Sequence, residues 1–110
     1  MKLVKLSDLF DVEYGDSLEL NKLSKDDSGI NFVSRTAKNN GVSSRVEKID
    51  FLPTEAGVIT VALGGSVLST FLQPEPFYSG YHIHCLIAKT PMTDEEKLFY
   101  CSCIEENKYR

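Results

Sequence analysis

Two short patterns of metal-binding residue types stand near the end of the sequence. His82 and His84 are separated by one residue, and so are Cys101 and Cys103. On a strand, side chains two apart project from one face about 7 Å apart, so both imidazoles could reach one metal ion. On a helix, residues two apart lie about 200° apart around the axis, so the two thiols cannot converge. The sequence therefore predicts no metal site, with both histidines on a strand and Cys85, Cys101 and Cys103 as small buried side chains.

Catalytic motifs are equally absent from the sequence. No G-x-S-x-G pattern or other activated nucleophile beside an orienting base is present. Gly64-Gly65-Ser66 lacks the Lys and the helix start that a phosphate-binding loop requires. The acidic residues are scattered, so no pair can be assigned acid and base roles. We expect a protein that is not an enzyme and that needs no cofactor.

One segment, residues 34–48, has an excess of basic residues. It carries four Lys or Arg against one Glu, within a chain of 12 basic and 16 acidic residues. The net charge of −4 argues against a protein that coats nucleic acid indiscriminately, because neutralising phosphates needs a surplus of Lys and Arg. Two interpretations remain for this segment: a solvated surface loop, or a local patch that contacts a nucleic acid.

The residue types in the basic segment are those that meet DNA. Arginine forms two-pronged hydrogen bonds with guanine, asparagine does so with adenine, and Lys, Ser and Thr suit phosphates. The candidate DNA-binding residues are Ser34, Arg35, Thr36, Lys38, Asn39, Asn40, Ser43 and Arg45, with Ser44 as a further phosphate contact.

The elements that must position these residues begin with short ones. A capping residue at Ser7 predicts a helical turn over residues 7–10, and alternation over residues 10–14 predicts a first strand that stops at Gly15. Residues 26–29 are a turn signal, and residues 30–34 are expected to form a strand that leads into the basic segment, which we expect to be a loop with a tight turn at Asn40-Gly41.

The second half of the chain predicts further strands and one long helix. Residues 58–63 and 67–72 are rich in β-branched and aromatic residues and flank Gly64-Gly65, which indicates a hairpin, and residues 77–88 supply at least one more strand. Thr93 with Glu96 forms a capping box, so a helix should begin there and run to about residue 107. These elements predict an α+β domain with a mixed or antiparallel sheet, a short N-terminal helical turn and one long C-terminal helix.

The expected C-terminal helix is apolar on almost every side. A surface helix would show a single apolar stripe, so something should cover this one on two sides. The candidate interface residues are Leu98, Phe99, Tyr100 and Ile104. A protein-interaction module that uses this helix, including a homodimer, is therefore an alternative to DNA binding.

Length and composition limit the remaining classes of protein. With 110 residues, 42% of them hydrophobic, the chain is expected to form one domain with one core over residues 1–110. No run is long and apolar enough for a transmembrane helix or a secretory signal, so we expect no membrane association, a cytoplasmic location and three reduced cysteines.

The chain also resembles a known family, in three motifs that occur in the family's order. Residues 6–15 are similar to its opening, an apolar and acidic entry to a strand that ends in Gly. Residues 32–42 resemble its segment in which a strand is followed by Ser and then Asn-Asn-Gly-Val. Residues 57–66, followed by 71–78, are similar to its central hairpin and exit. The family is the target recognition domain of the specificity (S) subunits of type I restriction-modification systems and of related type IIG and BcgI-like enzymes.

The resemblance implies a function for the basic segment. It implies a non-catalytic, sequence-specific domain that binds double-stranded DNA and selects a half-site for partner methyltransferase and restriction subunits in phage defence. Family members usually continue into a Gly-Arg segment and a coiled-coil spacer helix, which are expected to be lacking after Arg110. The net acidic charge is a second departure, although a domain that reads a few base pairs in a larger complex need not be basic.

Overall fold

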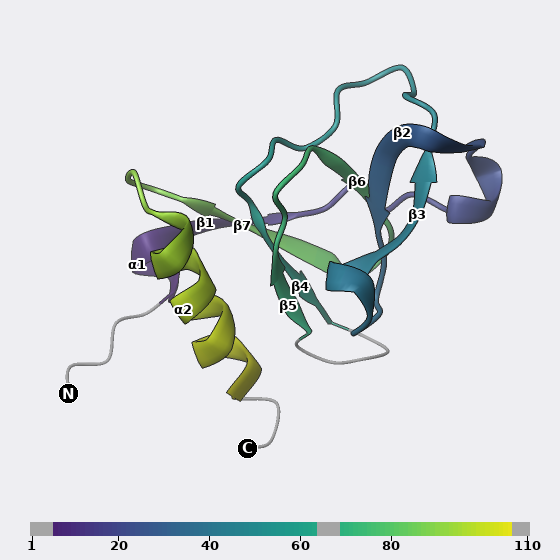
Figure 1. Ribbon diagram of the computed structural model, residues 1–110. Coiled ribbons are helices and arrows are strands. Elements are labelled where there is room, and N and C mark those ends of the chain that lie inside the picture. Colours follow the sequence, from purple (N-terminus) through teal and green to yellow (C-terminus); the bar gives the residue numbers. More distant parts are fainter. Residues whose placement is uncertain (1–5, 64–68, 107–110) are drawn as a thin grey trace.

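Two β-sheets and one long helix make up the structure, a computed structural model that describes residues 6–63 and 69–106 (Figure 1). The four-stranded sheet has the order β1 (Phe10–Tyr14), β7 (Ile83–Ala88), β4 (Ile59–Ala62), β5 (Thr70–Leu72). The three-stranded sheet has the order β3 (Val42–Val46), β2 (Lys25–Val33), β6 (Phe77–Ser79). Helix α2 (Asp94–Glu106) packs on one face of the four-stranded sheet, and the three-stranded sheet packs on the other face. The predicted α+β class is confirmed, with one antiparallel sheet and one mixed sheet.

The N-terminal elements follow the local sequence signals. Helix α1 (Leu6–Leu9) is a single turn, and β1 (Phe10–Tyr14) has the predicted bounds. Strand β1 is an edge strand that pairs antiparallel with β7 (Ile83–Ala88), with Phe10 opposite Ala88. Only Phe10 of β1 is buried, and it anchors the strand in the core.

The predicted central hairpin is present in part. Strands β4 (Ile59–Ala62) and β5 (Thr70–Leu72) pair antiparallel, with Thr60 opposite Phe71. All four residues of β4 are buried, because β4 is a central strand covered on both faces. The expected Gly64-Gly65 turn, Val67 and Leu68 lie outside the described residues.

The three-stranded sheet contains a strand, β3 (Val42–Val46), that the sequence did not predict. Strand β2 (Lys25–Val33) pairs antiparallel with β3 (Val42–Val46) and parallel with β6 (Phe77–Ser79). The expectation that the whole basic segment is a loop is therefore wrong, because its second half is β3. The turn predicted at residues 26–29 lies inside β2 as a bulge, since Lys25 and Ile30 both face Val46. Two 3-10 turns, η1 (Leu20–Lys22) and η2 (Asn39–Gly41), complete the described elements.

The His82 and His84 pattern is not a strand pattern. His84 lies on β7, but His82 precedes this strand in a turn and has a left-handed φ of 59°. The two imidazoles therefore do not project from one strand face, and the prediction that both histidines are strand residues is wrong.

Helix α2 begins with the predicted capping box and buries one face. The Glu96 amide donates to Thr93 Oγ1 at 3.1 Å, and the Thr93 amide donates to Glu96 Oε1 at 3.2 Å. Cys101 and Ile104 are buried in a cluster with Phe10, Ile59, Val61 and Leu86. Ile104 therefore belongs to the core and is not available as an interface residue. Tyr100 is half-buried and packs edge-on against Phe10, so only Leu98 and Phe99 of the four candidates are exposed, at 52% and 63%.

Candidate nucleic-acid interface

A polar depression of about 190 Å³ lies where β2, β3, η2 and the segment after β5 meet. We call it the Arg45 depression, and its lining residues are Asn31, Asn39, Asn40, Val42, Arg45, Gln73 and Pro74. Asn31 on β2 is directly opposite Arg45 on β3, so both side chains project from one face of the sheet. Asn31 and Val33 share that face by alternation, and Val33 packs in the layer between the two sheets. The depression is therefore at the rim of the inter-sheet core.

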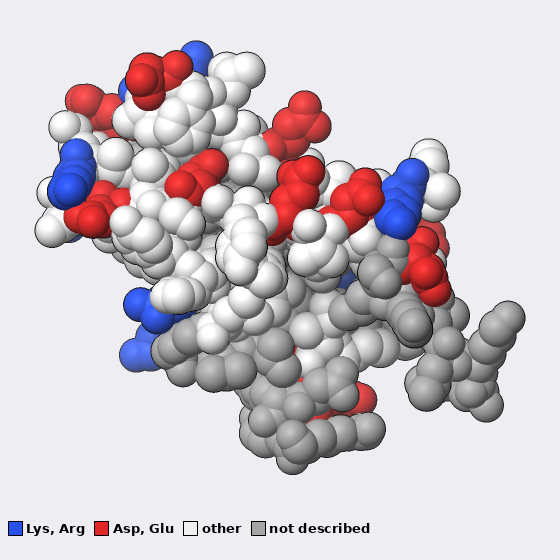
Figure 2. Space-filling view, turned by 180° about the vertical axis from the view of Figure 1, so that it is seen from behind, with Lys and Arg blue, Asp and Glu red and all other residues white. Residues whose placement is uncertain are grey.

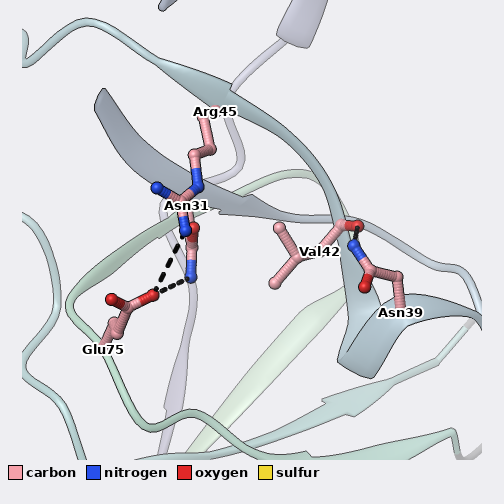
Figure 3. A network of polar contacts seen from close by, with 5 residues as sticks. All are labelled: Asn31, Asn39, Val42, Arg45 and Glu75. Atoms are coloured by element: carbon pink, nitrogen blue, oxygen red, sulfur yellow. Dashed lines mark hydrogen bonds and ion pairs between the residues drawn. The ribbon is translucent and has the colours of Figure 1, made fainter. Parts of the chain in front are cut away.

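Arg45 is held at this rim by an acidic residue. Its Nη2 lies 3.6 Å from Glu75 Oε2, and Asn31 Nδ2 donates to the same oxygen at 3.1 Å (Figure 3). Asn31 is only 8% exposed, whereas the side chains of Arg45 and Glu75 are 46% and 58% exposed. The buried amide thus fixes the carboxylate, and the carboxylate holds a guanidinium that faces solvent.

The loop that precedes β3 has an unusual backbone. Asn39, Asn40 and Gly41 have consecutive positive φ angles of 51°, 56° and 80°, a conformation that Asn and Gly tolerate best. Asn39 Nδ2 donates to Val42 O at 3.0 Å, and Asn40 Nδ2 donates to Leu72 O at 2.9 Å (Figure 3 shows the first). Both amide donors therefore hold the loop. A two-pronged contact with adenine requires this donor together with Oδ1, so it would break these bonds.

The buried side chain of Gln73 hydrogen-bonds to the backbone of the same loop. Its side chain is fully buried, and Nε2 donates to Asn40 O at 2.9 Å and to Thr60 Oγ1 at 3.1 Å. Gln73 Oε1 is buried without a hydrogen-bond partner in the described part of the chain. A buried amide of this kind links the loop to β4, so the depression has a rigid floor.

Arg35 lies in a different place from Arg45. It lines a separate depression of about 430 Å³ together with Glu19, Phe32, Ser34 and Tyr81. Phe32 projects from the face of β2 opposite to Asn31, so the two arginines of the basic segment are not brought together.

The remaining candidates form the connection between the two depressions. Ser34 and Ser43 share a hydrogen bond of 2.6 Å, and the Ser34 amide donates to Gly41 O, which closes the loop. Thr36 Oγ1 accepts from the Lys38 amide at 3.2 Å, and Lys38 is exposed. Ser44, the further phosphate candidate, is half-buried on β3. Of the eight candidate residues, Arg35, Lys38 and Arg45 present exposed cationic side chains.

On the back of the molecule, the described residues form no continuous basic surface. Figure 2 shows the back of the molecule, where acidic side chains are scattered between basic ones without a continuous basic surface on that face.

The cysteines and acidic residues of the described segments do not form a metal or nucleophile site. No group of three or more His, Cys, Asp or Glu side chains in residues 6–63 and 69–106 is placed to hold a metal ion. Burial, reinforced by Asp16 and Glu13, raises the pKa of Cys85 to about 11, and burial beside Glu105 raises that of Cys101 to about 11. Such thiols are poor nucleophiles at neutral pH. Cys103 is a half-buried thiol.

Three residues of the Arg45 depression and its rim were missed by reasoning from the sequence. Asn31, Gln73 and Glu75 come from β2 and from the segment after β5, outside the basic segment. The prolines at 74 and 76 were a usable signal, since they predict a rigid, extended segment that presents Glu75. The pairing of Asn31 with Arg45 required the strand register and could not be read locally.

Comparison of the chain with known proteins identifies its family. Residues 1–109 match the family described as the type I restriction modification DNA specificity domain. The chain belongs to this family, as its motifs suggested. The family is defined by DNA specificity rather than by a catalytic activity, in agreement with the expectation that the chain is not an enzyme.

Individual relatives are similar over most of this chain. The specificity subunit S.BcgI of a type II restriction enzyme from Heyndrickxia coagulans is 28% identical over 102 residues, which are 91% of this chain and 29% of the relative. Two crystal structures share the fold: a type I restriction-modification S subunit from M. genitalium (18% identity, TM-score 0.64) and an HsdS subunit from Thermoanaerobacter tengcongensis (17% identity, TM-score 0.69). Each comparison covers 94% of this chain, and 28% and 27% of the solved chains. The chain thus spans less than a third of the length of these relatives.

Proposed function

We propose that this chain is a sequence-specific, non-catalytic domain that binds double-stranded DNA in the cytoplasm. In this role it selects one half-site for partner methyltransferase and restriction subunits. The observation that carries the proposal is the Arg45 depression, where a guanidinium and several amides gather at an open rim. An arginine guanidinium hydrogen-bonds to base edges, and the neighbouring Lys38, Thr36 and Ser43 suit phosphates. Membership of a DNA specificity family supports the same role.

The contributions of the eight candidate residues differ in this proposal. Arg45 approaches base edges, whereas Arg35 and Lys38 contact phosphates or a neighbouring groove. Asn39 and Asn40 shape the loop through their side-chain bonds to Val42 and Leu72. Ser34, Thr36 and Ser43 complete the contact surface beside the loop.

Titration of a fluorescent random duplex, followed by anisotropy at two salt concentrations, tests DNA binding. Association should weaken steeply with salt, because phosphate contacts release counterions. On a duplex that the wild type selects from a randomised pool, the Arg35→Ala, Arg45→Ala double variant should lose about 1–3 kcal/mol for each arginine that contacts a base, or roughly 5–150-fold per site. Lys89→Ala is the control for each single arginine variant, since it removes one exposed positive charge beyond β7. Equal binding by the wild type and the double variant contradicts the proposal.

The two exposed apolar side chains of α2 favour a second candidate function. Leu98 and Phe99 are neighbours in sequence and exposed by more than half, a feature typical of protein-interaction sites. We propose that this face binds a protein, and self-association into a dimer is its simplest form. Sedimentation should then show a concentration-dependent dimer that Phe99→Glu abolishes and Leu52→Glu, at an exposed apolar residue outside α2, does not. A monomer at high concentration contradicts the dimer.

The two candidates make different predictions for salt. Burial of Leu98 and Phe99 depends little on ionic strength, whereas DNA binding through Arg35, Lys38 and Arg45 falls steeply with it.

No helix in residues 6–63 and 69–106 is long and apolar enough to cross a membrane.

A further inference from the structure

The segment from Gln73 to Phe77 presents one carboxylate at the rim of the Arg45 depression. Pro74 and Pro76 fix their own φ angles and restrict the residue before each to an extended backbone. Both ends of the segment are also paired. The backbone amide of Gln73 donates to Val58 O at 3.0 Å, and Phe77 and Thr54 exchange two backbone hydrogen bonds of 3.0 and 2.8 Å. The backbone on either side of Glu75 therefore has little freedom.

The side chain of Glu75 is fixed as well. Its Oε2 accepts from the buried Asn31 amide and faces Arg45 Nη2, so one oxygen serves both partners (Figure 3). Asn31 is anchored on β2 and is opposite Arg45 in the register. A long arginine side chain on an edge strand would otherwise sample many rotamers, and this network restricts it to few.

This ion pair does little for the stability of the fold. A pair whose side chains are 46% and 58% exposed is worth about 0–1 kcal/mol at most. The carboxylate also has a cost on a surface that meets DNA, because it repels phosphates and offsets the charge of Arg45. Neither the stability of the fold nor general DNA affinity therefore accounts for a carboxylate beside Arg45.

We propose that Glu75 is a specificity-determining positioning residue for Arg45, an inference that rests on the DNA-binding function proposed above. The carboxylate aligns the guanidinium for the O6 and N7 acceptors of a guanine and keeps Arg45 off the phosphate backbone. The guanine edge is neutral and accepts two hydrogen bonds, so the donors of Arg45 that do not face Glu75 can bind it. A phosphate carries a full negative charge and is repelled by Glu75 at the same position. Glu75 thus exchanges general affinity for base discrimination.

Selection of bound duplexes from a randomised pool tests this role, with the 110-residue chain as bait. The wild type should enrich a guanine at one position, and Arg45→Ala should lose the preference at that position. Glu75→Gln keeps the shape of the side chain but removes its charge, and it should weaken the same preference at least fivefold. Its affinity for random duplex should rise two- to tenfold, with the slope of log K against log salt steeper by about one.

Glu55→Gln is the matched control, because Glu55 is exposed and lines a different depression, beside β7 and α2. It should leave the selected sequence unchanged. Retention of the full guanine preference by Glu75→Gln overturns the inference, and so does a loss of preference at a position that Arg45→Ala does not affect. Binding and enrichment by the wild type keep the proposed function intact in both cases. Failure of the wild type to bind any duplex overturns the proposed function itself.

Discussion

Two regions of the molecule are held together by different interactions. One is the apolar layer between α2 and the four-stranded sheet, and the other is the Arg45 depression. Under α2, the buried side chains of Phe10, Ile59, Cys101 and Ile104 form an apolar layer. Two hydrogen bonds also join α2 to the rest of the chain, from the Thr70 amide to Glu105 Oε1 and from Lys97 Nζ to Gly57 O. At the depression, the side chains are amides and charges held by hydrogen bonds to backbone and to each other. Apolar burial contributes most of a domain's stability, whereas half-exposed ion pairs contribute little. Arg45 should therefore contribute far less to the stability of the fold than the apolar layer does.

The largest expected effect on this comparison comes from the apolar layer. Ile104→Ala should lower the free energy of unfolding by about 2–5 kcal/mol, because it removes buried methylene groups and leaves a cavity under α2. Urea denaturation followed by circular dichroism measures this loss. Arg45→Ala in the same assay should cost under about 1 kcal/mol. Equal losses for the two variants would show that Arg45 contributes as much to the free energy of unfolding as Ile104 does.

The buried amide of the depression comes next in size. Gln73→Ala removes the donor to Asn40 O and Thr60 Oγ1, so the buried Thr60 hydroxyl and the carbonyl of the loop both lose a hydrogen-bond partner. We expect a loss of about 1–3 kcal/mol in unfolding free energy. Hydrogen exchange at the amides of residues 38–42 should accelerate more than exchange in α2. Uniform acceleration across both regions would instead indicate a global effect.

The capping box of α2 gives a smaller change that is confined to the other region. Thr93→Ala removes the side-chain acceptor for the Glu96 amide, at a cost of about 1 kcal/mol. Its effect should appear in urea denaturation, while the affinity for duplex DNA stays unchanged. A change in DNA affinity would mean that α2 and the depression are coupled.

The smallest effect concerns Asp16, which links the end of β1 to β6. Burial raises the pKa of Asp16, although hydrogen bonds from the Ser79 amide and hydroxyl oppose the shift. A carboxyl with a raised pKa binds more protons in the folded state, so its contribution to stability falls as pH rises from 3.8 through the folded value. The unfolding free energy of the wild type relative to Asp16→Asn should decrease over that interval. A difference that is independent of pH would contradict this assignment.

Local signals in the sequence were sufficient where an element depends on neighbouring residues. The alternation of residues 10–14 gave β1, and the Thr93 and Glu96 spacing gave the start of α2. Asn40-Gly41 marked a turn because its left-handed backbone favours these residue types.

The remaining features depend on partners far away in the chain. Strand β3 carries Ser, Ser and Arg between two valines, and only its pairing with β2 identifies it as a strand. The separation of Arg35 from Arg45 follows from the two faces of β2. Ile104 was offered as an interface residue because composition alone does not show which side of an apolar helix is covered.

The position of β1 at the edge of its sheet has a consequence for synthesis on the ribosome. Phe10–Tyr14 is synthesised well before Ile83–Ala88, the strand with which it pairs and which separates it from β4. At a translation rate of about 5–20 residues per second, the first strand waits roughly 4–15 s for its partner. During that time Phe10 has no core to enter, and the hairpin of β4 and β5 lacks its central neighbour. The four-stranded sheet therefore closes only once β7 has been made, in a step that joins strands far apart in the sequence.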